Sequence, residues 1–387
     1  MRTNALVAHG GGPTAVINAS LAGLIEETRR RGSAGALYGA RGGLAGLLRA
    51  DFIDLLAVDP SLIRRIGEAP GSALGTSRLK LEPADYGRIL DIFRRANIGR
   101  FFYTGGNGSM DTALRVARFA RDTGDNLQVI GIPKTIDNDL AVTDHTPGYA
   151  STARFFACAA RDVGEDNRSL PAPVCVLETL GRNAGWIVAA TSFARKHPDD
   201  APHLIYFPER RLSLDRIAAD VERVYARLGR VVIAVCEGQL DDRDQPFGAD
   251  VDRSDNAAHR LASNLGHTLA GLISQKLRIR ARAEKPGLLG RCCGPFAAAL
   301  DREEALACGS AAASAAAAGH SEVMVALRRE SGVPYRATTF LTPLEGVARL
   351  ERLLPADWIH PDGNDVLPAF TEYAAPLVGE IAAWARL

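Results

Sequence analysis

The sequence contains little lysine and almost no net charge. Only five of its 46 basic residues are lysine, and 45 acidic residues reduce the formal net charge to +1. Such a balance produces no field that would gather nucleic acid or an acidic membrane surface, so we expect neither as a partner. No stretch of about 18 uncharged apolar residues is present, which argues against a membrane-spanning helix. Because residues 1–4 lead directly into a strand pattern without an export signal, we expect a cytoplasmic protein.

Paired cysteine motifs and lysine-based phosphate motifs are also missing. The six cysteines show no Cys-x-x-Cys pair and no metal-ligand spacing, so we expect reduced, mostly buried thiols without zinc or disulfides. The absence of Gly-Lys-Ser and Gly-Lys-Thr excludes a Walker-type phosphate loop. With 387 residues, 47% hydrophobic and 24% charged, the chain is typical of a soluble enzyme with two lobes.

Short apolar runs recur along the chain, each followed by a turn that is often rich in glycine and by an amphipathic segment. This alternation predicts an α/β fold in which helices cover mainly parallel sheets. The alanine tract 311–318 is predicted to form a packed helix without a functional role. Strands are predicted over residues 5–8, 100–103, 129–132, 174–177, 203–206 and 231–235, and helices from about Thr14 to Arg31 and from about Met110 to Arg121.

Two glycine-rich loops follow predicted strands, at Gly10-Gly11-Gly12 and at residues 105–109 (Gly-Gly-Asn-Gly-Ser). Loops at the carboxyl ends of strands gather at one edge of a doubly wound sheet, where ligands bind. Backbone N–H groups and the helix dipole would point at an anion there, so each loop is a candidate phosphate cradle. Glycine-rich turns also occur for steric reasons alone, but two of them in one sheet favour a polyphosphate ligand.

The stretch Gly-Ile-Pro-Lys-Thr-Ile-Asp-Asn-Asp, residues 131–139, places a lysine and two aspartates directly after a buried strand. A carboxylate beside a sugar hydroxyl can accept its proton, and a second carboxylate can hold Mg²⁺. A lysine can neutralise charge on a transferring phosphoryl group. Asp137, Asp139 and Lys134 are candidates for these three roles. An ordinary solvated turn is the alternative, because Asp-Asn-Asp is common in turns.

Further motifs follow along the chain, and their order is informative. They are Gly75-Thr76-Ser77-Arg78, Gly181-Arg182, Pro208-Glu209, Glu237-Gly238, Arg282, Arg291 and Asp301-Arg302. Together with the three loops above, they resemble the 6-phosphofructokinase family over nearly the whole chain, and are closest to its pyrophosphate-type branch. The resemblance implies the phosphofructokinase fold, with two Rossmann-like lobes and an active site in the cleft between them. Residues 1–148 and about 291–345 would form the phosphoryl-donor lobe, and residues 149–290 and about 346–387 the sugar-phosphate lobe.

The resemblance implies phosphoryl transfer to the 1-hydroxyl of fructose 6-phosphate, with Mg²⁺ as cofactor and a homodimer or homotetramer as the assembly. Asp137 would be the general base on that hydroxyl. Arg182 and Lys134 would stabilise the transferring phosphoryl group, and Asp139 and Asn107 would be the metal ligands.

The resemblance also implies two sets of binding residues. The donor would be bound by Gly11, Arg78, Gly106, Asn107, Gly108 and Ser109. The sugar phosphate would be bound by Thr135, Asp137, Leu180, Gly181, Arg182, Glu237, Arg282, Leu288 and Arg291. Arg282 and Arg291 would grip its 6-phosphate, where some arginines of the family reach across from a neighbouring subunit.

Three positions depart from the family pattern. Asn107 stands where many relatives have a metal-binding aspartate, and its neutral carbonyl offers weaker metal affinity, so metal binding would depend more on Asp139. Pro173 and Leu288 stand where typical bacterial ATP users have an arginine and a histidine. The identity of the sugar therefore stays open, with sedoheptulose 7-phosphate as an alternative acceptor. A non-catalytic regulatory homologue is the alternative to an enzyme.

The motifs disagree about the phosphoryl donor. Pyrophosphate users usually have an aspartate at the position of Gly108, and the glycine leaves room for a nucleotide, which slightly favours ATP. Lys134 is compatible with either donor. Residues 12–18 and 144–149 instead resemble the pyrophosphate-using branch, and Arg41 stands where some ATP users have a tyrosine beside the adenine. His145 within the second stretch is expected to be structural.

Overall fold

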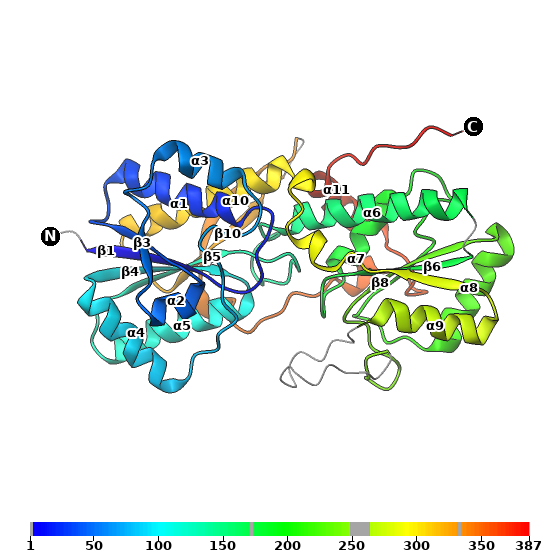
Figure 1. The fold of residues 1–387 in the computed structure, drawn as a ribbon, viewed down its shortest axis with the longest axis horizontal. Helices are drawn as coiled ribbons and strands as arrows, with labels where there is room; N and C mark the ends of the chain where they lie inside the picture. The colour runs from blue at the N-terminus through cyan, green and yellow to red at the C-terminus, as the bar shows by residue number, and fades with distance from the viewer. Residues whose placement is uncertain (1–2, 171–172, 248–263, 332–333, 387) are drawn as a thin grey trace. The chain divides into compact units, whose positions relative to one another are not determined.

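The computed structural model describes residues 3–170, 173–247, 264–331 and 334–386. The chain divides into two compact units, each built around a sheet (Figure 1). Unit 1 comprises Met1–Ala150 and Arg291–Arg352, and unit 2 comprises Ser151–Gly290 and Leu353–Leu387.

The sheet in the described part of unit 1 has seven strands in the order β11-β10-β5-β4-β1-β2-β3. Neighbouring strands from β10 to β2 pair in parallel, whereas the outer strands β11 and β3 pair antiparallel. β1 has β2 on one side and β4 on the other, so the strand order reverses between β1 and β4. The strands are β1 (Asn4–His9), β2 (Leu37–Ala40), β3 (Phe52–Asp54), β4 (Ile98–Gly105), β5 (Gln128–Pro133), β10 (Val323–Arg329) and β11 (Ala337–Pro343).

Helices cover both faces of this sheet, and each face has its own hydrophobic core (Figure 1). One face carries α1 (Ile17–Arg31), α3 (Pro60–Glu68) and α10 (Ala299–Ala317), and the other carries α2 (Gly43–Leu48), α4 (Pro83–Arg95) and α5 (Asn107–Asp122). The short helices η3 (Gly294–Phe296) and η4 (Leu344–Gly346) complete the unit.

The alanine tract lies in α10, which packs closely on α1. A Cβ on Gly23 would overlap the carbonyl oxygen of Leu306, and a Cβ on Gly309 would overlap that of Ser20. The two backbones are therefore in contact, and small residues at this crossing are a packing requirement. The prediction of a packed helix is confirmed.

Unit 2 contains a parallel sheet in the order β7-β8-β6-β9. Helices α8 and α9 pack on one face and α6 on the other (Figure 1). The strands are β6 (Val174–Thr179), β7 (Leu204–Tyr206), β8 (Val231–Cys236) and β9 (Ala281–Glu284). The helices are α6 (Tyr149–Ser169), α7 (Trp186–Ala190), α8 (Leu214–Leu228), α9 (Leu265–Leu277) and α11 (Pro368–Val378), with the short helices η1 (Thr191–Ala194), η2 (Gly287–Arg291) and η5 (Ala356–Trp358).

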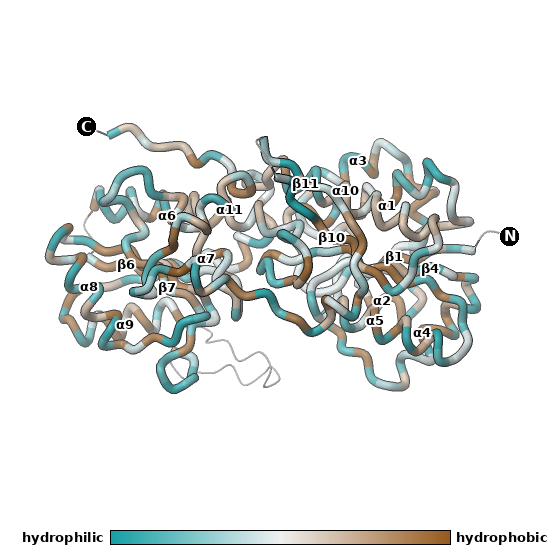
Figure 2. Tube along the Cα trace, turned by 180° about the vertical axis from the view of Figure 1, so that it is seen from behind, coloured by the Kyte–Doolittle hydropathy of each residue, from teal (hydrophilic) through white to brown (hydrophobic). Residues whose placement is uncertain are grey.

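The strands that were predicted from continuous apolar runs are covered on both faces. Every residue of β6 and β8 is buried, and Figure 2 shows the hydrophobic colour along β6 and around β1. Parallel sheets between two helical layers have this pattern. The predicted α/β fold with mainly parallel sheets is confirmed.

Two helix boundaries differ from the prediction. α1 begins at Ile17 instead of Thr14, because the hydroxyl of Thr14 accepts a hydrogen bond from the Val16 N–H (3.3 Å) and forms a local turn. α5 begins at Asn107, three residues before the predicted Met110. All six cysteines are free, and four of them are buried. Among the helices described, none combines the length and hydropathy needed to cross a membrane.

Candidate functional site

The two glycine loops of unit 1 follow the neighbouring strands β1 and β4, at the point where the strand order reverses. The Gly10 N–H donates to the Thr104 carbonyl (2.8 Å), and the Gly11 N–H donates to the Ser77 carbonyl (3.1 Å). The exposed Arg78 follows Ser77 in the chain. Predicted donor residues from three separate segments therefore meet at the edge where doubly wound sheets bind ligands.

The glycine loop after β4 contains both constrained and unconstrained positions. A Cβ on Gly105 would overlap the buried hydroxyl of Ser109, which also hydrogen bonds to Tyr103. A Cβ on Gly108, by contrast, would meet no atom within 4 Å. Gly106 is the N-cap of α5 and provides no side-chain cap, so the first N–H groups of this helix remain available to an anion.

The side chain of Asn107 is held by the segment that ends unit 1. Its Nδ2 donates to the Leu350 carbonyl (2.5 Å), and its Oδ1 accepts from the Arg349 N–H (2.7 Å). The donor and acceptor partners fix which end of the amide is oxygen. The Asn107 oxygen, which the family resemblance implies to be a metal ligand, therefore already accepts one hydrogen bond from the protein.

A buried cation lies beneath the first glycine loop. Lys134 is 3% exposed, and its ammonium donates to the carbonyls of Gly10 (2.8 Å) and Gly12 (2.7 Å). Burial, followed by the positive charge of Lys134, lowers the pKa of His9 to about 3, so this imidazole is neutral at pH 7. Lys134 thus ties the loop after β5 to the loop after β1 and supplies a fixed positive charge there.

The loop after β5 is shaped around Asn138. This residue is fully buried in the left-handed region (φ +56°), which asparagine tolerates better than most residues, and its Oδ1 accepts from the Thr146 N–H (3.0 Å). The Asp137 N–H donates to the Thr135 hydroxyl (3.1 Å). Asp137 and Asp139 lie on either side of Asn138 and are partly buried. The turn is therefore a constrained structure and not a solvated loop.

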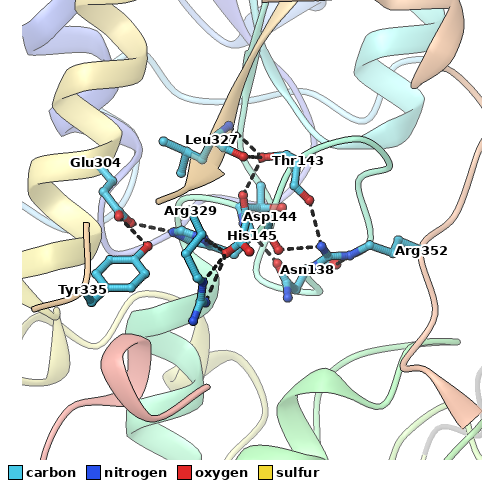
Figure 3. Close-up of polar contacts among 10 residues, drawn as sticks. Asn138, Thr143, Asp144, His145, Glu304, Leu327, Arg329, Tyr335 and Arg352 are labelled. Atoms are coloured by element: carbon cyan, nitrogen blue, oxygen red, sulfur yellow. Dashed lines mark hydrogen bonds and ion pairs between the residues drawn. The ribbon is translucent and has the colours of Figure 1, made fainter. Parts of the chain in front are cut away.

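A charged network lies behind this loop (Figure 3). The imidazole of His145 pairs with Asp144 (2.8 Å) and with Glu304 of α10 (2.6 Å), and the Tyr335 hydroxyl donates to Glu304 (2.8 Å). Burial by itself lowers the pKa of His145, but Asp144 and Glu304 outweigh it and raise the pKa to about 9. A buried, ion-paired His145 agrees with the expected structural role.

The loops after β6 and β8 bring four predicted residues of unit 2 together: Leu180, Gly181, Arg182 and Glu237. The Glu237 N–H donates to the Thr179 carbonyl (2.9 Å). Gly181 and Arg182 both have positive φ, +132° and +53°. A strained backbone at a non-glycine residue is common at functional sites. A Cβ on Gly238 would overlap the Arg182 carbonyl, so the glycine permits this close approach.

Two charged residues that the sequence analysis did not assign lie beside Glu237. Burial, and then the charge of Glu178, raises the pKa of Glu237, while Arg182 and Lys285 oppose the shift. Glu178 is 2% exposed, accepts from the Gly266 N–H (2.7 Å) and pairs with Lys285 (2.9 Å). A carboxylate within an apolar strand run was the signal that could have identified Glu178.

The remaining predicted sugar-phosphate residues are distributed over three places. Arg282 on β9 forms an ion pair with Asp166 of α6. Leu288 is 66% exposed in η2. Arg291 belongs to unit 1, where a Cβ on Gly12 would lie 3.2 Å from its guanidinium carbon. The structure therefore places Arg291 beside the first glycine loop of unit 1.

Comparisons with known proteins agree on one family. The family model described as phosphofructokinase matches residues 4–316. The chain is 38% identical over 381 residues to a pyrophosphate-fructose 6-phosphate 1-phosphotransferase from Rhodospirillum rubrum, covering 97% of this chain and 94% of that protein. It is 32% identical over 356 residues to a sulfofructose kinase from Alkalicoccus urumqiensis, covering 91% of each. A solved pyrophosphate-dependent phosphofructokinase from Nitrosospira multiformis matches with a TM-score of 0.89 and 33% identity, covering 100% of this chain and 94% of that one.

Proposed function

We propose that this chain, which belongs to the phosphofructokinase family, transfers a phosphoryl group from pyrophosphate to the 1-hydroxyl of fructose 6-phosphate. The family resemblance inferred from the motifs is confirmed by the family model and by the relatives. The preference for ATP that Gly108 suggested is unconfirmed, and the names of the relatives from Rhodospirillum rubrum and Nitrosospira multiformis specify pyrophosphate.

The observation that carries this proposal is the constrained loop after β5. It holds two carboxylates, Asp137 and Asp139, on either side of the buried Asn138, and it begins with the buried ammonium of Lys134. The uncapped N-terminus of α5 lies beside it, since the Lys134 N–H donates to the Gly105 carbonyl (3.1 Å). Positive charge, free N–H groups and a carboxylate base are the parts that phosphoryl transfer to a hydroxyl requires.

Asp137 would accept the proton of the sugar 1-hydroxyl as its oxygen attacks the terminal phosphorus. The new O–P bond forms while the bond from phosphorus to the leaving phosphate breaks. Lys134 and the N-terminus of α5 would balance the charge of the donor, and Arg182 would donate to the oxygens of the transferring group. Thr135, Glu237 and Arg282 keep the sugar-binding roles that the family resemblance implies.

The residues around Asp139 are suited to Mg²⁺, and they do not form a site in which protein side chains supply all the metal ligands. In the parts of the chain described, no group of three or more His, Cys, Asp and Glu residues forms a cage. Mg²⁺ usually binds through one or two carboxylates, with phosphates and water as its other ligands. We therefore assign Asp139 to the metal, and Asn107 keeps the weaker metal-binding role that the resemblance implies, since its oxygen accepts from the Arg349 N–H with only one of its two lone pairs. When bound, Mg²⁺ would neutralise phosphate charge.

The donor is tested by assays with pyrophosphate or ATP as the only donor, on the wild type and on Gly108→Asp. The space around Gly108 accommodates the new side chain, so the variant should fold normally. Its carboxylate would repel a nucleotide, and any ATP activity should fall by roughly 100-fold while pyrophosphate activity remains. Gly108→Asn, which has the same size without the charge, separates repulsion from steric exclusion. Turnover with ATP alone would overturn the pyrophosphate proposal, and no turnover with either donor would support a non-catalytic homologue.

The acceptor has a second candidate class. A sulfofructose kinase is among the relatives, and the exposed Leu288 stands where typical bacterial ATP users have a histidine. Ranking fructose 6-phosphate, sedoheptulose 7-phosphate and a sulfofructose by kcat/KM tests this directly. A higher kcat/KM for either alternative would change the substrate and leave the reaction class intact.

A further inference from the structure

Residues 349–352, here called the 349–352 segment, run along the site loops just before the chain passes into unit 2. An isolated antiparallel bridge between Leu140 and Glu351 joins the segment to the loop after β5. Figure 3 shows Arg352 extending from this segment toward Asn138 and Thr143. None of the sequence motifs described above falls in this segment.

One end of the segment holds the glycine loop after β4, which contains Asn107 and is here called the donor loop. The Arg349 N–H and the Leu350 carbonyl bind the two ends of the Asn107 amide (2.7 Å and 2.5 Å), at the first residue of α5. These contacts use the backbone of the segment. The guanidinium of Arg349 points elsewhere, to Asp111 (2.8 Å) on the exposed side of the helix.

The other end holds the loop that carries the two candidate catalytic carboxylates. The Arg352 N–H donates to the Asp139 carbonyl (2.8 Å). The Arg352 guanidinium donates to the carbonyls of Asn138 (3.3 Å), Thr143 (2.7 Å) and Asp144 (2.5 Å), as Figure 3 shows. A planar guanidinium can bind several carbonyls at fixed angles, which a lysine ammonium does less well.

The three guanidinium contacts come from one side chain, and they bind both ends of a turn that has no regular secondary structure. Charged hydrogen bonds of this kind are individually stronger than neutral ones, and together they restrict where the turn can lie. The same segment fixes α5 through Asn107. Four consecutive residues therefore contact both the donor loop and the Asp137 turn, in addition to the direct hydrogen bond from the Lys134 N–H to the Gly105 carbonyl (3.1 Å).

We propose that Arg352 is a positioning residue, which holds the turn carrying Asp137 and Asp139 at a fixed distance from the donor loop at Asn107. This inference rests on the proposed function, since it gives Arg352 a part in phosphoryl transfer. Arg352 acts through the backbone of the turn. Misplacement of a reacting group by about 1 Å can lower a rate by roughly 100-fold, so the effect should appear mainly in kcat.

Two arginines of the same segment provide a matched pair of variants. Arg352→Met removes the three guanidinium contacts and retains the backbone contact to the Asp139 carbonyl. Arg349→Met removes an exposed ion pair and retains the backbone contacts to Asn107. We expect Arg352→Met to lower kcat by roughly 100-fold with the KM for fructose 6-phosphate changed by less than about threefold. Arg349→Met should change kcat by less than about twofold, because exposed ion pairs contribute little. The kcat of Arg352→Lys should lie between those of the wild type and Arg352→Met.

Amide hydrogen exchange over residues 136–146 gives a readout that does not need turnover. Exchange there should accelerate in Arg352→Met and stay unchanged in Arg349→Met, with α1 and β1 as internal references. If the wild type has no turnover, the proposed function fails, and the exchange data still decide whether Arg352 fixes the turn. Unchanged kcat and exchange in Arg352→Met would overturn the inference. A loss of thermal stability in Arg352→Met without a change in kcat would also overturn it. So would an equal loss of kcat in Arg349→Met.

Discussion

The two sheet edges that carry candidate site residues are held in place in different ways. In unit 1, side-chain contacts hold the long loop after β5: Lys134 of the loop binds the first glycine loop, Asn138 binds Thr146 within the loop, and Arg352 binds three of its carbonyls. In unit 2, the short loops after β6 and β8 are held mainly by close approach of the backbone, and the Cys236 thiol donates to the Arg182 carbonyl (3.3 Å). There Arg182 adopts a left-handed conformation directly against Gly238.

The two kinds of loop should respond differently to substitution. A loop held by side chains can lose its position, or its chemistry, while the sheet beneath it stays folded. A loop held by backbone contact cannot move without disturbing the strands that it joins, because β6 and β8 pair up to Thr179 and Cys236. We therefore expect substitutions in the candidate catalytic residues of the loop after β5 to affect rate before stability, and substitutions in the loops after β6 and β8 to affect stability together with rate.

The largest effect should come from Asp137→Asn in unit 1. The change removes the base but retains the Asp137 N–H that donates to Thr135. We expect kcat to fall by roughly 1000-fold, within the range for loss of a general base. Thermal stability and the calorimetric affinity for fructose 6-phosphate should stay close to wild type. Turnover near the wild-type level would exclude Asp137 as the base.

The second prediction concerns the backbone contact between Gly238 and Arg182 in unit 2. Gly238→Ala would push a methyl group into the Arg182 carbonyl, and we expect it to lower the free energy of unfolding of unit 2 by about 3 kcal/mol. Gly271→Ala in α9 is the control: its Cβ meets nothing within 4 Å, so it should raise stability by about 0.5–1 kcal/mol. All three tryptophans lie in unit 2, so urea titration followed by tryptophan fluorescence reports this unit. Equal stability of the two variants would contradict the backbone argument.

The smallest effect should be the pH dependence of two buried histidines. His145 in unit 1 has its pKa raised to about 9 from an ordinary 6.5. Its contribution to stability is complete below pH 6.5 and is lost as the pH rises toward 9. His203 in unit 2 has its pKa lowered to about 4 by burial and by the charge of Arg230, so its contribution is present above pH 6.5 and is lost toward pH 4.

Urea titrations of the wild type, His145→Gln and His203→Gln at pH values from 5 to 9 test these signs. We expect His145→Gln to flatten the alkaline decline and His203→Gln to flatten part of the acid decline. Circular dichroism follows both units, and tryptophan fluorescence follows unit 2. An unchanged alkaline decline in His145→Gln would show that the pKa of the imidazole is not raised in the folded protein.

Local patterns predicted the fold well, because strands buried on both faces appear as continuous apolar runs. The helix starts were less accurate, since α5 begins within the glycine loop, where intrinsic helix preference is low. The candidate site was predicted where its residues cluster in short motifs such as 133–139. Asn138 gave only a weak signal, that of an asparagine suited to a left-handed turn.

Arg352 gave no signal in the sequence. Its guanidinium partners lie between 208 and 214 residues earlier in the chain. No local pattern connects an arginine in an irregular segment with carbonyls so distant, because folding alone brings them together. Glu178 differs, since a carboxylate in a buried strand requires a partner, although the sequence does not say that the partner is Lys285.

The contact between α1 and α10 extends the mutational sensitivity of the site well beyond the residues that line it. α10 carries Asp301, which accepts from the Gly148 N–H (2.8 Å), and Glu304, which pairs with His145. Because the backbones of the two helices touch at Gly23 and Gly309, a single added methyl group at either position would displace these anchors. Gly23 and Gly309 contact no predicted site residue, and yet we expect them to tolerate substitution nearly as poorly as the loop after β5.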